Sequence, residues 1–352
     1  MSPMIRGIKQ PVLRTLKVLG LHGEWNNSRW RRERLAILCY HGIAVEDEHE
    51  WNPELYMDVA RLEERLKILS DGGYNVLPLA EAIRCLSEKS LPPQSVALTF
   101  DDGGYDFCLR AFPLLKKYGF PATVYLSTYF CYRARPIFPL CAYYLLWKAR
   151  DSFRGDELRD WGCPANLNLR NGSGVTTAVN GIVAHANQLA PAERHKIVEQ
   201  LVERLGLDYD AFLRKRLFQL MNPKEITRLA SDGVDFQLHT HRHRVPKEHD
   251  LFVHEIAENR RCILEMTGVD AIHFCYPSGV YDPVFLPWLS EQRVVSATTC
   301  EGGLASIQDH PLLLPRIVDT GRMSPIEFES ALAGISVSLV RRLPKRQAVR
   351  TS

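Results

Sequence analysis

The feature that most constrains the fold is an alternation of short apolar runs with longer helix-like stretches. The helix-like patterns occur at residues 57–71, 105–118, 190–205, 250–267 and 325–334. Alternation of this kind is typical of parallel strands joined by crossover helices. We therefore predict an α/β fold, a distorted (β/α)7-type barrel that is closed or nearly closed. Its expected strands are residues 35–40, 74–79, 95–100, 121–127, 234–239, 272–277 and 293–299, with a weaker one at 312–318.

One long segment interrupts this alternation. About 90 residues, 129–222, separate two expected strands. They contain the largely apolar stretch 138–150, a polar loop at 166–174, and helix patterns at 191–205 and 209–220. Long insertions of this kind lie on the surface and often carry function. We expect a single barrel domain at residues 35–338 with a helical insertion at about 129–222.

The two ends of the chain are basic. Residues 1–34 hold eight Lys or Arg against two Glu, and residues 339–352 hold five and no acid. We interpret them as a basic N-terminal arm and a basic C-terminal tail. Residues 12–21 form an amphipathic helix on an anionic membrane in one interpretation. An ordinary surface helix or a disordered arm is the alternative.

The composition of the chain gives only weak evidence about its partners and its cellular compartment. No stretch has the character of a signal peptide or a membrane span, and the nine scattered cysteines contain no CxxC pair. Such cysteine usage is typical of free thiols in a reducing compartment, so we expect a cytoplasmic protein, with peripheral membrane contact through its basic ends as the alternative. The net charge of +3 gives no sign of nucleic-acid binding. The oligomeric state is left open.

The run SVALTF at 95–100 ends in two adjacent carboxylates, Asp101 and Asp102. In α/β folds ligands bind at the carboxyl ends of the strands. Two carboxylates at such an end repel each other unless a positive group neutralises one of them, and a divalent cation does so well. The alternative is that an aspartate caps the helix expected from Tyr105.

A second polar cluster also follows an expected strand. The segment HTHRH carries His239 and His243, four residues apart, which is the spacing that places two imidazoles on one side of a helical turn. One carboxylate and two histidines are a ligand set suited to Zn²⁺, and also to Co²⁺, Ni²⁺ or Fe²⁺. Surface histidines without a metal are the alternative.

In this order, TFDDG and HTHRH resemble the first two motifs of the NodB-homology polysaccharide deacetylases, carbohydrate esterase family 4. The resemblance covers roughly residues 35–128 and 222–330. It implies that Asp102, His239 and His243 hold a divalent metal, most often Zn²⁺, and that Asp101 is the catalytic base.

Two further motifs of the family are altered. In FCYPSG, at 274–279, Cys275 stands where the family usually has an arginine that orients the base, and we expect Arg316 to supply the guanidinium unless it forms a plain surface ion pair. The segment LAILCYHG, at 35–42, resembles the fifth motif moved to the front of the chain, as in poly-N-acetylglucosamine deacetylases. This implies that His41 is the general acid, and the alternative is a core histidine that closes a strand.

The resemblance implies a metal-dependent N-deacetylase acting on an N-acetylated saccharide. Candidate substrate-binding residues follow expected strands: Tyr129, Tyr276, Pro277 and Gly279. A backbone N–H near Gly103 or Tyr129 is expected to stabilise the oxyanion. A carbohydrate O-acetyl esterase and a non-catalytic saccharide-binding barrel are the alternatives.

Overall fold

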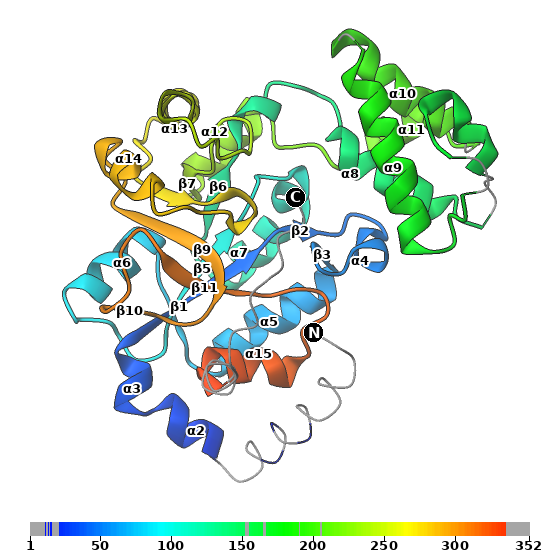
Figure 1. Ribbon diagram of the computed structural model, residues 1–352. Coiled ribbons are helices and arrows are strands. Elements are labelled where there is room, and N and C mark those ends of the chain that lie inside the picture. The colour runs from blue at the N-terminus through cyan, green and yellow to red at the C-terminus, as the bar shows by residue number, and fades with distance from the viewer. Residues whose placement is uncertain are drawn as a thin grey trace.

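The computed structural model describes residues 21–335, except 152–154, 165–166, 190 and 205, together with residues 11, 13 and 15. Half of the expected N-terminal arm at 1–34 and the whole C-terminal tail at 339–352 lie outside the described residues. The rest forms a closed barrel with helices around it and a group of helices on one side (Figure 1).

Seven parallel strands close the barrel, in the order β1, β11, β9, β8, β7, β6 and β5, with β5 pairing back to β1. The first strand in sequence thus fills the gap between β5 and β11. The predicted (β/α)7-type barrel is confirmed. The strands are β1 (Arg34–Tyr40), β5 (Ser95–Phe100), β6 (Thr123–Leu126), β7 (Asp235–Leu238), β8 (His273–Cys275), β9 (Ser296–Gly302) and β11 (Leu314–Val318).

The remaining strands are short accessories: β2 (Gly42–Ile43), β3 (Tyr56–Met57), β4 (Asn75–Val76) and β10 (Ala305–Ser306). The expected strand at 74–79 shrinks to β4, which pairs only with the beginning of β5. The barrel strands are buried on both faces, as in β5, where all six residues are buried. Burial on both faces explains why the sequence shows continuous apolar runs instead of alternation.

Helices cover the outside of the barrel: α5 (Val59–Asp71), α6 (Leu79–Ser87), η1 (Phe107–Ala111), α7 (Phe112–Tyr118), α12 (Pro223–Ser231), α13 (His249–Thr267), α14 (Phe285–Glu291) and α15 (Pro325–Leu332). In α5 the face formed by Leu62, Leu66 and Leu69 is buried, as its spacing predicts. The Asp58 side chain caps this helix by accepting a hydrogen bond from the Arg61 N–H at 2.8 Å.

The insertion is a helical unit with its own hydrophobic cluster. It contains α8 (Phe138–Lys148), η3 (Gly155–Trp161), α9 (Gly172–Asn187), α10 (Pro191–Arg204) and α11 (Tyr209–Arg214), and Figure 1 shows these helices grouped beside the barrel. The cluster includes Phe218, whose ring contacts those of Trp51, next to β3 at the end of α4 (Glu48–Trp51), and of Tyr56 in β3.

Two expectations for the insertion are wrong. The helix at 209–220 ends at Arg214, because Arg216 and Phe218 adopt positive φ angles of 54° and 59°. The polar loop at 166–174 leads directly into α9, which begins after Asn171. Its side chain accepts a hydrogen bond from the Gly174 N–H at 2.7 Å.

Part of the expected N-terminal arm packs against the barrel. Two short helices, α2 (Leu21–Asn26) and α3 (Arg29–Arg32), lie near β1 and α15 (Figure 1). Arg31 is fully buried and donates hydrogen bonds to the carbonyl oxygens of Leu332 and Arg34, each at 2.6 Å. These bonds satisfy the buried guanidinium and hold the two ends of the barrel domain together. Among the described residues, no helix is long and apolar enough to cross a membrane.

Candidate active site

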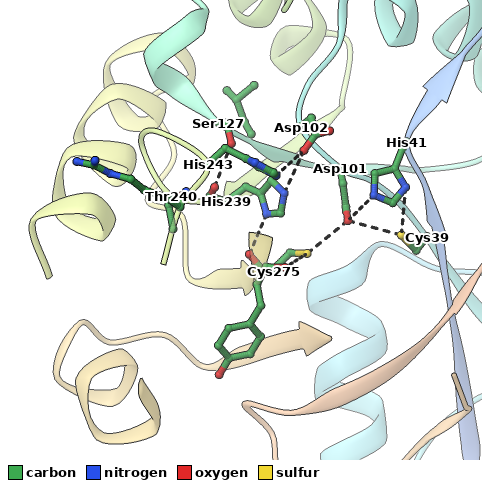
Figure 2. A network of polar contacts seen from close by, with 12 residues as sticks. Cys39, His41, Asp101, Asp102, Ser127, His239, Thr240, His243 and Cys275 are labelled. Atoms are coloured by element: carbon green, nitrogen blue, oxygen red, sulfur yellow. Dashed lines mark hydrogen bonds and ion pairs between the residues drawn. The ribbon is translucent and has the colours of Figure 1, made fainter. Parts of the chain in front are cut away.

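The two aspartates that follow β5 face different partners. Asp101 lies toward β1 and β11, whereas Asp102 lies toward the loop that follows β7 (Figure 2). Asp102 adopts a positive φ of 70°, a conformation that side chains other than glycine rarely take and that is often found at functional sites. The turn thereby separates two carboxylates that are neighbours in sequence.

Asp101 is buried and paired with Arg316. The guanidinium donates from Nη1 to Asp101 Oδ1 at 2.8 Å and from Nη2 to Oδ2 at 2.7 Å. Burial raises the pKa of Asp101, but the charge and hydrogen bonds of Arg316 outweigh it and hold the pKa well below its ordinary value. The expected contact between Arg316 and the base candidate is present, and Arg316 is fully buried rather than part of a surface pair.

Asp102, His239 and His243 converge on one point. Asp102 Oδ1 lies 3.2 Å from His239 Nε2 and 3.1 Å from His243 Nε2. Figure 2 shows both histidines pointing toward Asp102. This buried oxygen has no hydrogen-bond partner among the described residues. In a tetrahedral zinc site with bonds of about 2.0–2.1 Å, ligand atoms lie about 3.3 Å apart. The donor set and its spacing therefore fit a divalent cation.

Within this cluster, the pKa values of Asp102 and His243 are both shifted toward the charged form. Burial raises the pKa of Asp102, but His239 and His243 together lower it well below its ordinary value. The pKa of His243 is lowered by burial and raised more strongly by Asp102. About a third of the Asp102 and His243 side chains is exposed, so the cluster is open to the cleft on one side. An open side is typical of catalytic rather than structural metal sites.

Backbone contacts fix the orientation of His239. Its Nδ1 lies 2.8 Å from the carbonyl oxygen of Cys275, which makes Nδ1 the protonated nitrogen and leaves the Nε2 lone pair toward Asp102. The backbone N–H of His239 donates to Asn259 Oδ1 at 2.9 Å, and Ser127 Oγ donates to the backbone carbonyl of His239 at 3.0 Å. The imidazole is therefore held in the tautomer that a metal ligand requires.

The prediction that a helical turn brings His239 and His243 together is wrong. The segment after β7 is a loop in which Thr240 and His243 adopt φ angles of 59° and 55°. The loop is held by Glu255, whose buried carboxylate accepts hydrogen bonds from the Arg242 side chain at 2.9 Å and from Arg244 Nε at 3.0 Å. A loop with two positive φ angles, anchored by the buried Glu255 carboxylate, thus brings the histidines together in place of a helical turn.

His41 lies at the end of β1, across Asp101 from the metal-ligand candidates. Its Nε2 is 3.8 Å from Asp101 Oδ2 and its Nδ1 is 4.0 Å from Cys39 Sγ. The side chain is partly exposed, at 22%, so it is not a core histidine. The structure therefore brings His41, Asp101 and the Asp102–His239–His243 cluster to one rim of the barrel.

Two thiols beside Asp101 were not predicted as site residues. Cys39 Sγ and Cys275 Sγ lie 3.5 Å and 3.4 Å from Asp101 Oδ2, and burial raises the pKa of both thiols. Arg316 Nη2 also lies 3.1 Å from Cys275 Sγ. The side chain of Cys39 lies on the same face of β1 as His41, two residues later, and that spacing is the signal that would have identified it.

The four expected substrate-binding residues differ in how far they are exposed to a ligand. Tyr276 and Pro277 are buried, and the Tyr276 hydroxyl donates to the Leu312 carbonyl, so these side chains have no surface to offer a ligand and the expectation for them is corrected. Gly279 packs so closely on Cys300 that a Cβ atom would lie 2.7 Å from the Cys300 Cβ. Tyr129 is partly exposed, but Arg133 stacks on its ring at 3.7 Å.

The backbone amides suggested for the oxyanion are already engaged. The Gly103 N–H donates to the Asp101 carbonyl at 2.9 Å, and the Tyr129 N–H donates to the His241 carbonyl at 2.8 Å. Neither amide is free to bind an oxyanion in this conformation, so that expectation is also corrected.

A cleft opens at this rim between the barrel and the insertion. Its walls combine His41, Asp101 and Asp102 with side chains that the insertion or its connections supply, among them Leu140 and Phe218. Asp106 also lines the cleft, with Oδ2 accepting a hydrogen bond from the Ile43 N–H at 2.6 Å. Burial raises the pKa of this carboxyl to about 7. The insertion therefore shapes the space in front of the site.

Comparison with known proteins agrees with this geometry. The polysaccharide deacetylase family profile matches residues 88–136 and 190–297, which contain Asp101, Asp102, His239 and His243. Over these two segments the chain is similar to the polysaccharide deacetylase family. His41 and Arg316 lie outside the matched segments, on the first and last strands of the barrel.

Curated relatives match this chain over a limited region. The Bacillus subtilis (strain 168) protein YxkH is 36% identical over 94 residues, and the Escherichia coli (strain K12) poly-β-1,6-N-acetyl-D-glucosamine N-deacetylase is 33% identical over 96 residues. Each match covers 26% of this chain, and respectively 32% and 14% of the relative.

Solved structures show the same fold over most of the chain. The Streptococcus pyogenes deacetylase PplD in complex with acetate superposes with a TM-score of 0.56 at 22% identity, covering 85% of this chain and 98% of that one. IcaB from Ammonifex degensii superposes with a TM-score of 0.51 at 17% identity, covering 86% and 96%. At these identities the likeness concerns the fold.

Proposed function

We propose that this chain is a divalent-metal-dependent hydrolase that removes acetyl groups from an N-acetylated saccharide. The observation that carries the proposal is the convergence of Asp102, His239 and His243 beside a buried, arginine-paired Asp101 and a partly exposed His41. A metal-ligand set next to a separate base and acid is an arrangement that can hydrolyse an amide.

Asp102, His239 and His243 would hold the cation, which we propose to be Zn²⁺, with Co²⁺ or Ni²⁺ as substitutes. When bound, the cation supplies a Lewis acid that polarises the acetyl carbonyl and makes water more acidic. The hydrogen bond from His239 Nδ1 to the Cys275 carbonyl keeps Nε2 available for this purpose.

Asp101 would take a proton from the attacking water. Its two hydrogen bonds to Arg316 keep the carboxylate ionised and fix its orientation, although the same ion pair makes it a weaker base. Arg316 also donates from Nε to the Thr299 carbonyl at 2.9 Å, which fixes the guanidinium itself. We therefore assign Arg316 the positioning of the base, in place of the motif arginine that is replaced by Cys275.

His41 would donate a proton to the amide nitrogen as the carbon–nitrogen bond breaks. Without that proton the leaving group is an amide anion, which is very unstable in water, so the reaction depends on a positioned acid. His41 lies 3.8 Å from Asp101, so the two groups face the same reacting centre from one side of the cleft. The products are acetate and a free amino sugar.

The substrate class follows from the relatives. The E. coli relative is named for poly-β-1,6-N-acetyl-D-glucosamine, and the family for polysaccharides. We therefore infer that an N-acetylated saccharide enters the cleft between the barrel and the insertion.

The test is acetate release from N-acetylglucosamine oligomers by metal-stripped protein with and without added Zn²⁺. We expect release only with metal, and Asp101→Asn should abolish turnover while it retains the metal. Asp71→Asn, at the exposed end of α5, is the matched control and should leave turnover unchanged. Release from acetylated xylan but not from the oligomers would identify an O-acetyl esterase. Saccharide binding without any acetate release would identify a binding protein.

A further inference from the structure

A second groove lies beside the catalytic cleft. Its volume is about 600 Å³, within the range of about 300–1,000 Å³ in which proteins bind organic ligands. One wall is residues 131–134, which follow the short helix η2 (Thr128–Phe130) after β6. The other is the end of the insertion, residues 213–223.

A thin partition separates the groove from the cleft. Gln219 and Leu220 line both spaces. Leu220 forms an antiparallel bridge with Gly104, and the Tyr105 N–H donates to the Gln219 carbonyl at 2.9 Å. The partition is therefore hydrogen-bonded to the turn that follows Asp101 and Asp102. The groove therefore lies on the other side of this partition from the catalytic aspartates.

Arginines give the groove its chemical character. Arg133, Arg214 and Arg216 all line it. Arg216 is held in place by Glu225 and stacks on Tyr105 at 3.8 Å from the ring centre, and Arg214 lies 3.8 Å from Asp208 in an exposed pair. Two carboxylates thus accompany three guanidiniums, which leaves the groove with a net positive charge.

Arg133 uses only part of its hydrogen-bonding capacity. Its guanidinium stacks on Tyr129, and Nη1 donates to the Tyr129 carbonyl at 2.9 Å. Within the described part of the chain, no carboxylate lies within ion-pair distance of it. Stacking on a ring orients the planar fork without using most of its N–H groups. Next to it, Tyr132 is 53% exposed and offers an aromatic face in the same groove.

We propose that this groove binds an anionic group, a carboxylate or a phosphate, that the saccharide substrate carries next to the acetamide. A preoriented guanidinium recognises both anions with paired hydrogen bonds, and an exposed tyrosine packs on the apolar face of a sugar ring. The inference rests on the proposed deacetylase function and narrows it from N-acetylated saccharides in general to acidic ones.

The experiment compares three kinds of oligomer of matched length: neutral chitin oligomers, hyaluronan oligomers in which glucuronate alternates with N-acetylglucosamine, and chitin oligomers that end in a phosphate. We expect kcat/KM to be higher for at least one acidic series. Arg133→Ala and Arg214→Ala should each lower the ratio of acidic to neutral kcat/KM, on the order of tenfold for Arg133, whose hydrogen bonds to the anion are charge-assisted. Added salt should also lower the ratio.

Arg29→Ala is the matched control, because this exposed arginine lies on α3 and lines neither the cleft nor the groove. It should leave the ratio unchanged. A preference for only the hyaluronan series identifies a carboxylate, and a preference for only the phosphorylated series identifies a phosphate. Equal kcat/KM for all three series, or a ratio that both groove variants leave unchanged, overturns the proposal.

Direct binding separates this proposal from the proposed function. The same oligomers are titrated by calorimetry into the Asp101→Asn variant, with and without Arg133→Ala. If no acetate is released from any substrate, the hydrolase proposal fails, but tighter Arg133-dependent binding of an acidic series still supports the groove. If acetate is released and the acidic series bind no more tightly than the neutral one, the groove proposal fails while the hydrolase proposal stands.

Discussion

Replacing Arg316 by methionine should destabilise the protein through Asp101. The Arg316 side chain is fully buried and that of Asp101 is 2% exposed. Methionine preserves much of the aliphatic volume but removes the Arg316 N–H groups that donate to Asp101 and to the Thr299 carbonyl. Breaking a buried ion pair from one side typically costs about 3–5 kcal/mol, because the other charge stays buried without compensation.

That loss is large enough to measure by two methods. With an unfolding entropy of about 2.1 cal/mol/K per residue, a loss of about 3–5 kcal/mol in a chain of 352 residues lowers Tm by about 4–7 °C. Urea unfolding followed by circular dichroism gives the free energy of unfolding directly. Arg84→Met is the control, because Arg84 forms an exposed pair with Glu88, and surface pairs contribute about 0–1 kcal/mol.

A double-mutant cycle identifies the cause. Asp101→Asn alone leaves Arg316 buried without its partner, whereas the double variant Asp101→Asn/Arg316→Met removes both charges together. We expect the double variant to lose much less stability than the two single variants combined, with a coupling of several kcal/mol. Additive losses, or an Arg316→Met variant within about 1 kcal/mol of the wild type, would refute the argument that the pair is mutually dependent.

Three other substitutions test further contacts. His41→Ala should slow amide hydrolysis by about 10²–10⁴-fold and slow hydrolysis of an activated acetyl ester much less, because only the amine needs protonation; equal losses would indicate a structural role. Asp106→Asn should become more stable relative to the wild type as the pH rises from about 4 to about 7. The folded wild type keeps the Asp106 proton up to about pH 7, whereas the unfolded chain loses it near 3.8, and a Tm difference constant from pH 5 to 9 would contradict this. Asp319→Ala removes the buried carboxylate that accepts from Arg65 Nε at 2.9 Å and, among the described residues, leaves the buried guanidinium only the half-exposed Glu64 as an ionic partner. It should cost about 3–5 kcal/mol in urea unfolding, and a loss below about 1 kcal/mol would show that the Arg65–Asp319 pair does not stabilise the fold.

The residues of the site could be predicted because parallel strands bring their carboxyl ends to one rim. Asp101 and Asp102 follow β5, His239 follows β7 and His41 follows β1, so topology alone places them together. The pairing of β1 with both β5 and β11 confirms that the first strand closes the barrel. The sequence indicated this only through the resemblance of its LAILCYHG segment to a motif that normally comes last.

Side-chain directions after the strands could not be predicted. Tyr276 turns into the core, where its hydroxyl meets the Leu312 carbonyl, although its position in the motif indicated a substrate contact. Loop conformation decides which carboxylate meets the histidines, through positive φ angles at Asp102 and His243 that no local propensity indicates. Such conformations persist only when the surrounding packing enforces them.

The missed helix α9 shows a different limit. It begins with Gly, Ser, Gly and Val, followed by two threonines, and these residues have low helix propensity. Its buried face, Val175, Ala178, Val179 and Ile182, nevertheless repeats with helical spacing and packs in the insertion cluster. Tertiary packing here outweighs propensity, and the periodicity was the better guide.

The central claim is that Asp102, His239 and His243 together hold one divalent cation. The most direct measurement is a crystal structure of zinc-loaded protein with anomalous data collected on both sides of the zinc absorption edge. We predict a single anomalous peak within bonding distance of Asp102 Oδ1 and of Nε2 of both histidines. This peak should be absent in His239→Ala. A zinc-loaded crystal without a peak between these three side chains, or with its only peak elsewhere, would contradict the account.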